Sequence, residues 1–268
     1  MSSSSNTENK DWIRVTRRRG RKREIFPTPR NTSGDCESWA PADTETNQER
    51  QSKLMQKIQS CLEKVRTSRF FAVFLDQIQT QEFEDRFRNV LSSELSMPMV
   101  IYGIGSIDFC DRSRRQLSLA ILLKRQFYWI GEIEVFDPVL SATECKVLED
   151  LGCSVLSVNE QGRRQASRPT LFFMPHCEAI LYDNLLLTNW RMELLNRVVL
   201  FGNSFTVYSE ACSSNISTIS RDSRHILAAQ KFVHEFRIDS SDDDYFTAFH
   251  DSSWHFFCPN FDSDLDFH

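Results

Sequence analysis

Short apolar runs, each ended by glycine, proline or polar residues, recur from residue 99 onward and are separated by stretches with helical spacing. Continuous apolar runs of this kind are typical of strands that are buried on both faces of a parallel sheet. The strands predicted from them span 99–104, 133–138, 154–158, 170–174 and 198–201. Strands that alternate with helices form βαβ units, whose crossovers are right-handed. The pattern therefore predicts an α/β fold with an open, doubly wound, mostly parallel, Rossmann-like sheet.

The remaining elements complete the predicted layout. Helices are expected at about 112–127, 178–187 and 217–230, and Ser141-Ala-Thr-Glu144 is a capping box that starts another. Two further strand-like stretches, 231–238 and 248–257, flank an acidic turn at 239–244 and predict an antiparallel edge hairpin near the C-terminal end. Five parallel strands and two closing antiparallel strands resemble the layout of the S-adenosylmethionine-dependent methyltransferases. A shared layout does not determine function.

The segment before the first strand divides into a polar tail and a helical part. Residues 1–48 contain mostly Ser, Thr, Asn, Arg, Glu and Pro, and we expect them to form a disordered basic tail. Residues 49–96 carry three apolar stripes with helical spacing, which include Leu62, Phe74 and Phe87. We expect these N-terminal helices to pack on an α/β domain that spans 97–268 and includes the hairpin.

The charge is distributed unevenly along the chain. Residues 1–30 carry nine Lys and Arg against three Asp and Glu, a net +6, whereas the whole chain has a net charge of −5 and the rest therefore carries −11. The basic run from Arg14 to Arg23 is typical of a segment read by a nuclear import receptor, although a solvated tail explains the same composition. The acidic body argues against direct nucleic-acid binding by the folded part.

Neither a membrane span nor a secretory signal is expected. The longest apolar run, Phe70–Leu75, is far shorter than the roughly 18 residues that a spanning helix needs. The polar start of the chain lacks the apolar stretch of a signal peptide. The eight cysteines include no C-x-x-C pair, and we expect them to stay reduced inside a cell. The expected location is the nucleus and the cytoplasm.

Polar residues and glycines follow several of the predicted strands. In a doubly wound sheet a ligand binds beyond the carboxyl ends of the strands, where the strand order reverses. The candidate binding residues at these ends are Gly103, Gly105, Ser106, Asp137, His176, Asn203 and Ser204. The glycines allow close approach of a ligand, and Asp137 can accept hydrogen bonds from ribose hydroxyls, which fits a nucleotide or S-adenosylmethionine.

Other features of the same segment speak against such a cofactor. Asp108 stands where G-x-G-x-x-G requires its third glycine, and Tyr102 stands where methyltransferases usually carry an acidic residue. Asp137 precedes Pro138, so capping of the following turn explains it equally well.

The remaining reactive side chains do not form a recognisable catalytic or metal site. His176 and Cys177 are adjacent at a strand end, so their side chains point apart and a structural role is favoured over a nucleophile pair. His250 and His255 lie in a predicted strand without zinc-ligand spacing. Cys258-Pro259 is the dipeptide that some haem-responsive proteins use. We therefore predict no catalytic residue and no metal ligand.

A series of motifs in residues 97–258 resembles the SRR family, which is named for a plant protein whose loss reduces sensitivity to red light. The matching stretches are Tyr102-Gly-Ile-Gly-Ser106, Val135-Phe-Asp-Pro138, Leu151-Gly-Cys-Ser-Val155, Met174-Pro-His-Cys177, Leu181-Tyr-Asp-Asn184-Leu185, Asn189-Trp190, Gly202-Asn-Ser204 and Phe249-His-Asp-Ser-Ser-Trp-His-Phe256. The Asp11-Trp-Ile-Arg-Val15 segment and the Met-Pro-His-Cys-Glu form are similar to the plant branch.

The resemblance implies a regulatory protein and transfers no catalytic residue. Plant members are linked to circadian clock input, clock-gene expression and phytochrome B signalling, so signalling or clock proteins are the implied partners. The favoured reading is a non-enzymatic regulator of clock input and of the red-light response. The alternatives are a methyltransferase-like enzyme that uses S-adenosylmethionine, and a regulator of haem biosynthesis, a role associated with animal and fungal relatives.

Overall fold

The computed structural model describes residues 38–213, 223–239 and 243–259. The basic run from Arg14 to Arg23 and the import signal predicted there lie outside the described residues, as does the start of the helix predicted at 217–230. No helix within the described ranges is long and apolar enough to cross a membrane.

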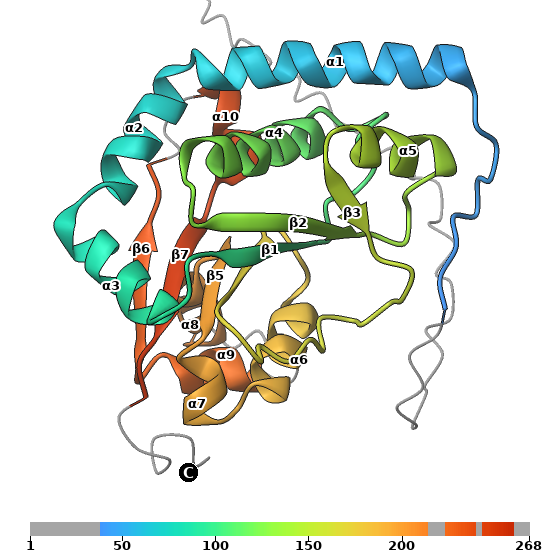
Figure 1. The fold of residues 1–268 in the computed structure, drawn as a ribbon. Helices are drawn as coiled ribbons and strands as arrows, with labels where there is room; N and C mark the ends of the chain where they lie inside the picture. The colour runs from blue at the N-terminus through green and yellow to red at the C-terminus, as the bar shows by residue number, and fades with distance from the viewer. Residues whose placement is uncertain (1–37, 214–222, 240–242, 260–268) are drawn as a thin grey trace, which may run out of the picture. The chain divides into compact units, whose positions relative to one another are not determined.

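A seven-stranded sheet forms the centre of the described structure (Figure 1). The strands are β1 (Met97–Tyr102), β2 (Ile130–Phe136), β3 (Cys153–Val155), β4 (Thr170–Met174), β5 (Val198–Asn203), β6 (Val233–Arg237) and β7 (Ser252–Phe257). Their order is β3-β2-β1-β4-β5-β7-β6, with β1 to β5 parallel and β7 antiparallel to both of its neighbours. The predicted doubly wound α/β fold is confirmed. Because β6 is antiparallel to β7, it runs in the same direction as the five parallel strands.

The helices cover both faces of the sheet. On one face lie α1 (Gln48–Arg66), α2 (Arg69–Ile78), α3 (Gln81–Leu91), α4 (Asp111–Gln126), α5 (Ala142–Asp150) and α10 (Asp243–Phe249). On the other lie α6 (Ala179–Thr188), α7 (Met192–Leu195), α8 (Phe205–Ser213) and α9 (Arg224–Ala229). Alternate side chains of β1 enter the two cores, since Met99 and Ile101 belong to the first and Val100 and Tyr102 to the second.

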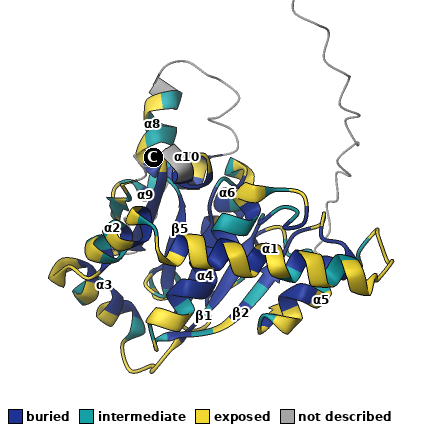
Figure 2. Ribbon diagram, turned by 90° about the horizontal axis from the view of Figure 1, so that it is seen from above, coloured by how far each residue is buried: buried dark blue, intermediate teal, exposed yellow. Residues whose placement is uncertain are grey.

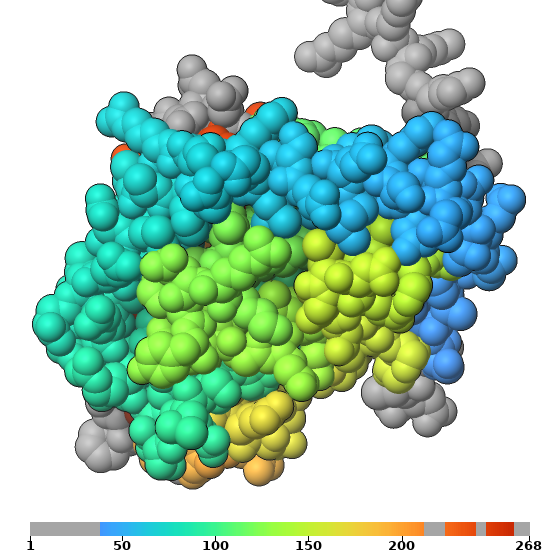
Figure 3. Space-filling model, turned by 45° about the horizontal axis from the view of Figure 1, so that its top comes forward, coloured from blue at the N-terminus to red at the C-terminus, as the bar shows by residue number. Residues whose placement is uncertain are grey.

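Helix α4 is buried by α1 as well as by the sheet. Leu117 and the run from Leu119 to Leu123 are buried, so apolar side chains occur on more than one side of this helix. The inward stripe of α1, which includes Leu54 and Ile58, covers its outer side, and Figure 2 shows the opposite side of α1 exposed. In Figure 3 the blue side chains of α1 lie along the green and yellow-green side chains of the sheet domain. The predicted helical stripes are therefore core faces.

The hairpin is correct in its pairing and wrong in its connection. Residues 248–251 were expected in a strand, but β7 begins at Ser252 and helix α10 precedes it. Tyr245 and Phe249 stack on Phe70 of α2 with ring centroids 5.0 Å and 4.8 Å apart. This aromatic contact favours a helix over a continued strand. Helix α8, which directly follows β5, was not predicted.

The segment directly before α1 contacts the sheet domain. Ser38 forms a β-bridge with Val158, and the backbone N–H of Trp39 donates to the carbonyl of Ser157 at 2.6 Å. The indole of Trp39 meets Phe136 edge-on, with ring centroids 5.3 Å apart. The sequence pattern placed these residues in the polar tail, whereas the structure describes them as part of the packed unit from residue 38 onward.

Candidate functional site

The turn after β1 holds Gly103 and Gly105 in the left-handed region, with φ of 68° and 73°. A Cβ atom on Gly103 would lie 2.6 Å from the Sγ of Cys177, and one on Gly105 would lie 2.9 Å from the Oγ of Ser113. The glycines are therefore required by close approach of the chain to itself as well as by their backbone conformation. The space that a ligand would need beside Gly103 is occupied by the Cys177 thiol.

Both carboxylate oxygens of Asp137 accept hydrogen bonds from the backbone. The N–H of Gly105 donates to Oδ2 at 2.7 Å, and the N–H of Val139 donates to Oδ1 at 2.9 Å. Burial raises the pKa of this carboxyl, against the lowering effect of the two hydrogen bonds. Asp137 thus caps its own turn, as one reading of the sequence suggested, and also ties the end of β2 to the turn after β1.

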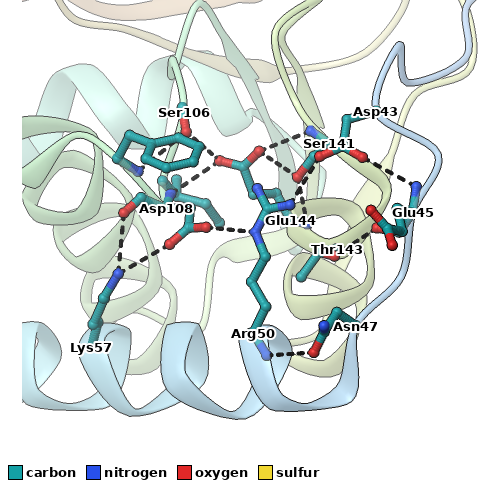
Figure 4. A network of polar contacts seen from close by, with 12 residues as sticks. Asp43, Glu45, Asn47, Arg50, Lys57, Ser106, Asp108, Ser141, Thr143 and Glu144 are labelled. Carbon is teal, nitrogen blue, oxygen red and sulfur yellow. Dashed lines mark hydrogen bonds and ion pairs between the residues drawn. The ribbon is translucent and has the colours of Figure 1, made fainter.

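Glu144 joins the capping box of α5 to the same turn (Figure 4). Its Oε2 accepts from the backbone and the hydroxyl of Ser141 at 2.8 Å and 2.7 Å. Its Oε1 accepts from the hydroxyl of Ser106 at 2.6 Å and from the backbone of Asp108 at 3.0 Å. Burial acts to raise the pKa of Glu144, but these hydrogen bonds hold it below its usual value. Ser106 is therefore committed to a contact within the protein.

Asp108 pairs with two cations of α1. Its carboxylate accepts from Nε of Arg50 at 2.8 Å and from Nζ of Lys57 at 3.0 Å, and Arg50 also reaches Asp43 at 2.9 Å. Although burial acts to raise the pKa of Asp108, the two ion pairs lower it. The residue that takes the place of the third glycine thus attaches the turn after β1 to the N-terminal helix (Figure 4).

Tyr102 at the end of β1 also faces a partner from its own chain. Its hydroxyl donates to the carboxylate of Glu160, which accepts as well from Arg164. Burial and the nearby carboxylate raise the pKa of Tyr102 far above its ordinary value, so the phenol stays protonated.

These contacts close the crevice at the ends of β1 and β2. The residues in this arrangement do not fit S-adenosylmethionine, because the carboxylate that would bind ribose is engaged by Gly105 and Val139, and the turn that would receive the cofactor is in close contact with Cys177 and Ser113. No step of a methyl transfer is therefore assigned to this end of the sheet.

The ends of β4 and β5 are open by contrast. A cavity of about 340 Å³ is lined by Arg112, His176, Asn203, Ser204, Tyr208 and His250, among others. Three of the predicted site residues, His176, Asn203 and Ser204, are thus brought to one cavity. Gly103, Gly105, Ser106 and Asp137 belong to the closed crevice instead.

His176 has the most unusual environment in this cavity. Its φ is 60°, and its backbone N–H donates to Oδ1 of Asn203 at 2.7 Å. Its Nε2 lies 3.1 Å from the carbonyl oxygen of His250, so Nε2 must carry the proton and donate. The other ring nitrogen, Nδ1, is then a buried acceptor without a partner among the described residues. Burial lowers the pKa of His176, which keeps the ring neutral.

The other lining groups are fixed by internal hydrogen bonds. Asn203 donates from Nδ2 to the carbonyl of Cys177 at 3.1 Å and to the hydroxyl of Tyr208 at 3.0 Å. The backbone N–H of Ser204 donates to the carbonyl of Asp251 at 2.6 Å. The rings of His176 and His250 lie 4.4 Å apart. The cavity is therefore lined by a preorganised set of polar groups, and the unused acceptor of His176 is buried beside it.

No activated nucleophile lies in this cavity among the residues that the structure describes. The Cys177 thiol donates to the carbonyl of Tyr102 at 3.2 Å, and burial raises its pKa well above the usual range. Ser204 is fully buried, and its hydroxyl accepts from the backbone of Val207 at 3.3 Å. The arrangement suits recognition by hydrogen bonds better than covalent catalysis.

Three cavity residues escaped the sequence analysis. Tyr208 lies on the helix that was not predicted, and Arg112 was only placed near a helix start. His250 was noticed but assigned to a strand, although its place in the Phe249-to-Phe256 motif could have indicated a role.

The structure also shows where His255 and Cys258 lie. His255 is fully buried in β7, and this burial lowers the pKa of its imidazole to about 4. Glu235, at 3.9 Å, opposes the effect and raises that pKa in part. Cys258 is exposed after β7. Within the described ranges no group of three or more His, Cys, Asp and Glu side chains could hold a metal ion.

Comparison with known proteins gives one family. The model of the SRR1 domain matches residues 83–256. "Protein SENSITIVITY TO RED LIGHT REDUCED 1" of Arabidopsis thaliana is 52% identical over 264 residues, which cover 98% of this chain and 95% of the relative. An "SRR1-like protein" of Mus musculus is 48% identical over 83 residues, covering 31% of this chain and 33% of that protein.

The solved structures with similar folds are remote in sequence. The crystal structure of a mutant of MtNAS has a TM-score of 0.41 and 14% identity, covering 78% of this chain and 71% of that chain. The plantazolicin methyltransferase BpumL in complex with SAH has a TM-score of 0.31 and 10% identity, covering 79% and 99%.

Proposed function

This chain belongs to the SRR1 family, and we propose that it regulates red-light and circadian-clock signalling by binding other molecules, without catalysing a reaction. The similarity to the Arabidopsis thaliana protein extends over 98% of the chain, so it includes the N-terminal helices as well as the sheet. The name of that relative supports a role in the red-light response.

The closed crevice at the ends of β1 and β2 is the structural observation that supports a protein without catalytic activity. The backbone N–H groups of Gly105 and Val139 each donate to one carboxylate oxygen of Asp137, and the Cys177 thiol fills the space beside Gly103. In an enzyme of this layout those groups would receive the cofactor. Their use within the protein supports loss of that chemistry.

The partners belong to the same proposal. Signalling or clock proteins are the proposed partners, and the protein would act in both the nucleus and the cytoplasm. The basic run from Arg14 to Arg23, which lies outside the described residues, supports recognition by an import receptor.

The proposal is tested by expressing this chain in Arabidopsis thaliana seedlings that lack the similar protein. Rescue is expected: red light should again inhibit hypocotyl elongation, and the period of a clock-gene reporter should return to that of the wild type. A fluorescent fusion in which Arg17–Arg19 and Arg21–Arg23 are replaced by Ala should lose nuclear accumulation. Seedlings that express the intact, folded chain and stay insensitive to red light would refute the role.

The non-enzymatic part is tested by calorimetric titration of the purified chain with S-adenosylmethionine. At about 1 mM ligand we expect no heat of binding and an unchanged Tm, because a ligand that binds the native state must stabilise it. Saturable binding together with a raised Tm would contradict this part of the proposal and leave the signalling role standing.

A further inference from the structure

A basic groove that shares no lining residue with the His176 cavity lies over the N-terminal helices. It is a hollow of about 700 Å³ between the second half of α1, the start of α2, the start of α4 and α10. Tyr245 of α10 donates from its hydroxyl to the backbone carbonyl of Lys64 at 3.0 Å, which places α10 against α1 (Figure 1). No candidate residue of the sequence analysis lines this groove.

The groove concentrates positive charge on a body that is acidic. The described lining side chains include five cations and a single carboxylate, that of Asp111; the cations are Lys57, Lys64, Arg69, Arg114 and Arg115. The chain from residue 31 onward carries a net −11, so this surface is a local exception. The five cations and one carboxylate are those of the described lining. The side chains of Asp242 to Asp244, which precede Tyr245 in the chain, lie outside the described residues.

Lys64 and Arg69 are exposed, and neither has a carboxylate partner in the described part of the chain. The other three are held in place. Nη1 of Arg114 donates to the carbonyls of Ile107 and Asp108, both at 2.9 Å. Arg115 pairs with Asp111 at 2.8 Å. The groove thus combines fixed donors with unneutralised charge, an arrangement that recognises anions.

The helix termini add to the same field. The lining includes Ser68 and Arg69 at the start of α2 and Asp111 at the start of α4. The amino end of a helix carries a partial positive charge and unpaired backbone N–H groups, both of which favour an anion. The two helix ends add to the positive potential of the cationic side chains.

The shape and lining indicate which anion would bind. A pocket for a small organic ligand is lined mainly by apolar and aromatic side chains, whereas this groove is predominantly polar. Lys57 and Lys64 lie about 10 Å apart along the helix axis at 1.5 Å per residue, and Asp108 holds the ammonium group of Lys57, so the cations extend along the groove. The one aromatic ring of the lining, Tyr245, is covered by the guanidinium of Arg115 at 5.4 Å, so it offers no stacking surface for a base.

We propose that the basic groove binds a phosphorylated, extended segment of a partner protein, with Lys64 and Arg69 as the principal contacts. Each phosphate carries nearly two negative charges and three acceptor oxygens, which suits adjacent cations with unused donors. A segment with two phosphates would satisfy both ends of the groove. This inference names a surface for the binding role proposed above, but its test does not depend on red-light signalling.

The test uses the purified full chain and an array of degenerate peptides that carry two phosphoserines, each beside its unphosphorylated twin and a twin with Glu in both positions. We expect binding to the phosphorylated peptides and at least about tenfold weaker binding to both twins. Equal binding of the Glu twins, or no binding at all, would overturn the proposal.

Two charge-reversal variants separate the groove from the overall charge. Lys64→Glu with Arg69→Glu should weaken phosphopeptide binding at least about tenfold. The matched control, Lys53→Glu with Arg66→Glu, changes the net charge equally on exposed positions of α1 outside the groove, and it should bind like the wild type. Equal losses in both variants, with unchanged melting curves, would contradict a specific groove.

Two competitors exclude other occupants. Inorganic pyrophosphate should compete only weakly, and duplex DNA should not displace the peptide at physiological salt, since the body is acidic. Displacement by DNA at concentrations similar to those of the peptide would assign the groove to nucleic acid instead.

Discussion

The two neighbouring ends of this sheet contrast in how their polar groups are satisfied. At β1 and β2, Asp137, Glu144 and Asp108 each pair with backbone or side-chain groups from other elements. At β4 and β5, the Nδ1 of His176 is buried without a described partner beside a cavity of about 340 Å³. The first end is an internal hydrogen-bond network, and the second is a preformed recess.

The contrast shows that the topological switch of a doubly wound sheet offers a place for a ligand without guaranteeing a site. The two glycines after β1 have the conformation that a cofactor turn requires, yet the Cys177 thiol and the Ser113 hydroxyl take the space. What the crevice can bind is decided by the side chains that reach it from α1, α5 and the turn after β4.

The closed end should be the more sensitive to added volume, and Gly103→Ala tests this most severely. The new Cβ would meet Cys177 and adopt a φ of 68°, so we expect a loss of about 2–4 kcal/mol in the free energy of unfolding, measured by urea denaturation.

The matched control for that variant is Gly152→Ala. Gly152 has a φ of 81°, but nothing lies within 4 Å of its added Cβ, so only backbone strain of about 1 kcal/mol is expected. In the double variant Gly103→Ala with Cys177→Ala, the new Cβ no longer meets a thiol. The loss in the free energy of unfolding should therefore be about 1 kcal/mol smaller than the sum of the losses of the two single variants. Equal effects of the two glycine variants would mean that the crevice beside Gly103 is open.

Glu144→Gln should produce the next largest effect. The amide replaces one accepting oxygen by a donor, which leaves part of the Ser106, Asp108 and Ser141 donors unsatisfied, at a cost of about 2–3 kcal/mol at pH 7. Glu149→Gln, on the exposed side of the same helix, should change stability by under about 0.5 kcal/mol.

The pH dependence gives an independent check of Glu144. The pKa of Glu144 is lower in the folded than in the unfolded protein. Between these two pKa values the unfolded state binds more protons, so the stabilisation that ionised Glu144 provides is lost as the pH falls. The difference in the free energy of unfolding between the wild type and Glu144→Gln should therefore be largest above pH 4.5, the ordinary pKa of Glu, and should decrease as the pH falls below that value. A difference that is constant from pH 7 to pH 3 would exclude an ionised Glu144.

The open end should tolerate substitution, which His176→Gly tests. Glycine accepts the φ of 60° without strain, and this offsets the loss of the ring contacts, so the stability at pH 8 should change by under about 1 kcal/mol. A loss as large as that of Gly103→Ala would show that the recess is as tightly packed as the crevice.

The same variant should alter the acid side of the stability profile. Burial lowers the pKa of His176 below 6.5, so in the wild type the unfolded state gains a proton first and stability falls as the pH drops below that value. His176→Gly lacks this titrating group, so its free energy of unfolding should increase relative to that of the wild type as the pH is lowered from 8 to 5. His255 titrates in both proteins, so its effect cancels in the comparison.

Local sequence signals predicted the elements well and their long-range partners poorly. The capping box at Ser141 and Glu144 is confirmed because it depends on residues three apart. The second role of Glu144, as acceptor for Ser106 and Asp108, arises only when α5 meets the turn after β1, and no local pattern encodes that meeting.

The error at α10 has a similar origin. Tyr245, Ala248 and Phe249 have the spacing of one helical face, but the helix is short and its partner, Phe70, lies far away in the sequence. The apolar residues that follow, up to Phe257, favoured a single longer strand. Propensity over so few residues is overridden by tertiary packing.

The ion pairs between α1 and the turn after β1 have a consequence for anyone who selects a fragment of this protein for expression. The family match begins at residue 83, but Arg50 and Lys57 neutralise the buried Asp108, and Leu54 and Ile58 cover α4. A fragment that begins at the start of the family match would keep β1 to β6, yet it would deprive Asp108 of both of its cation partners and expose the apolar outer side of α4 to water. The family match thus covers less of the chain than the unit that folds, whereas the similarity to the Arabidopsis thaliana protein includes α1.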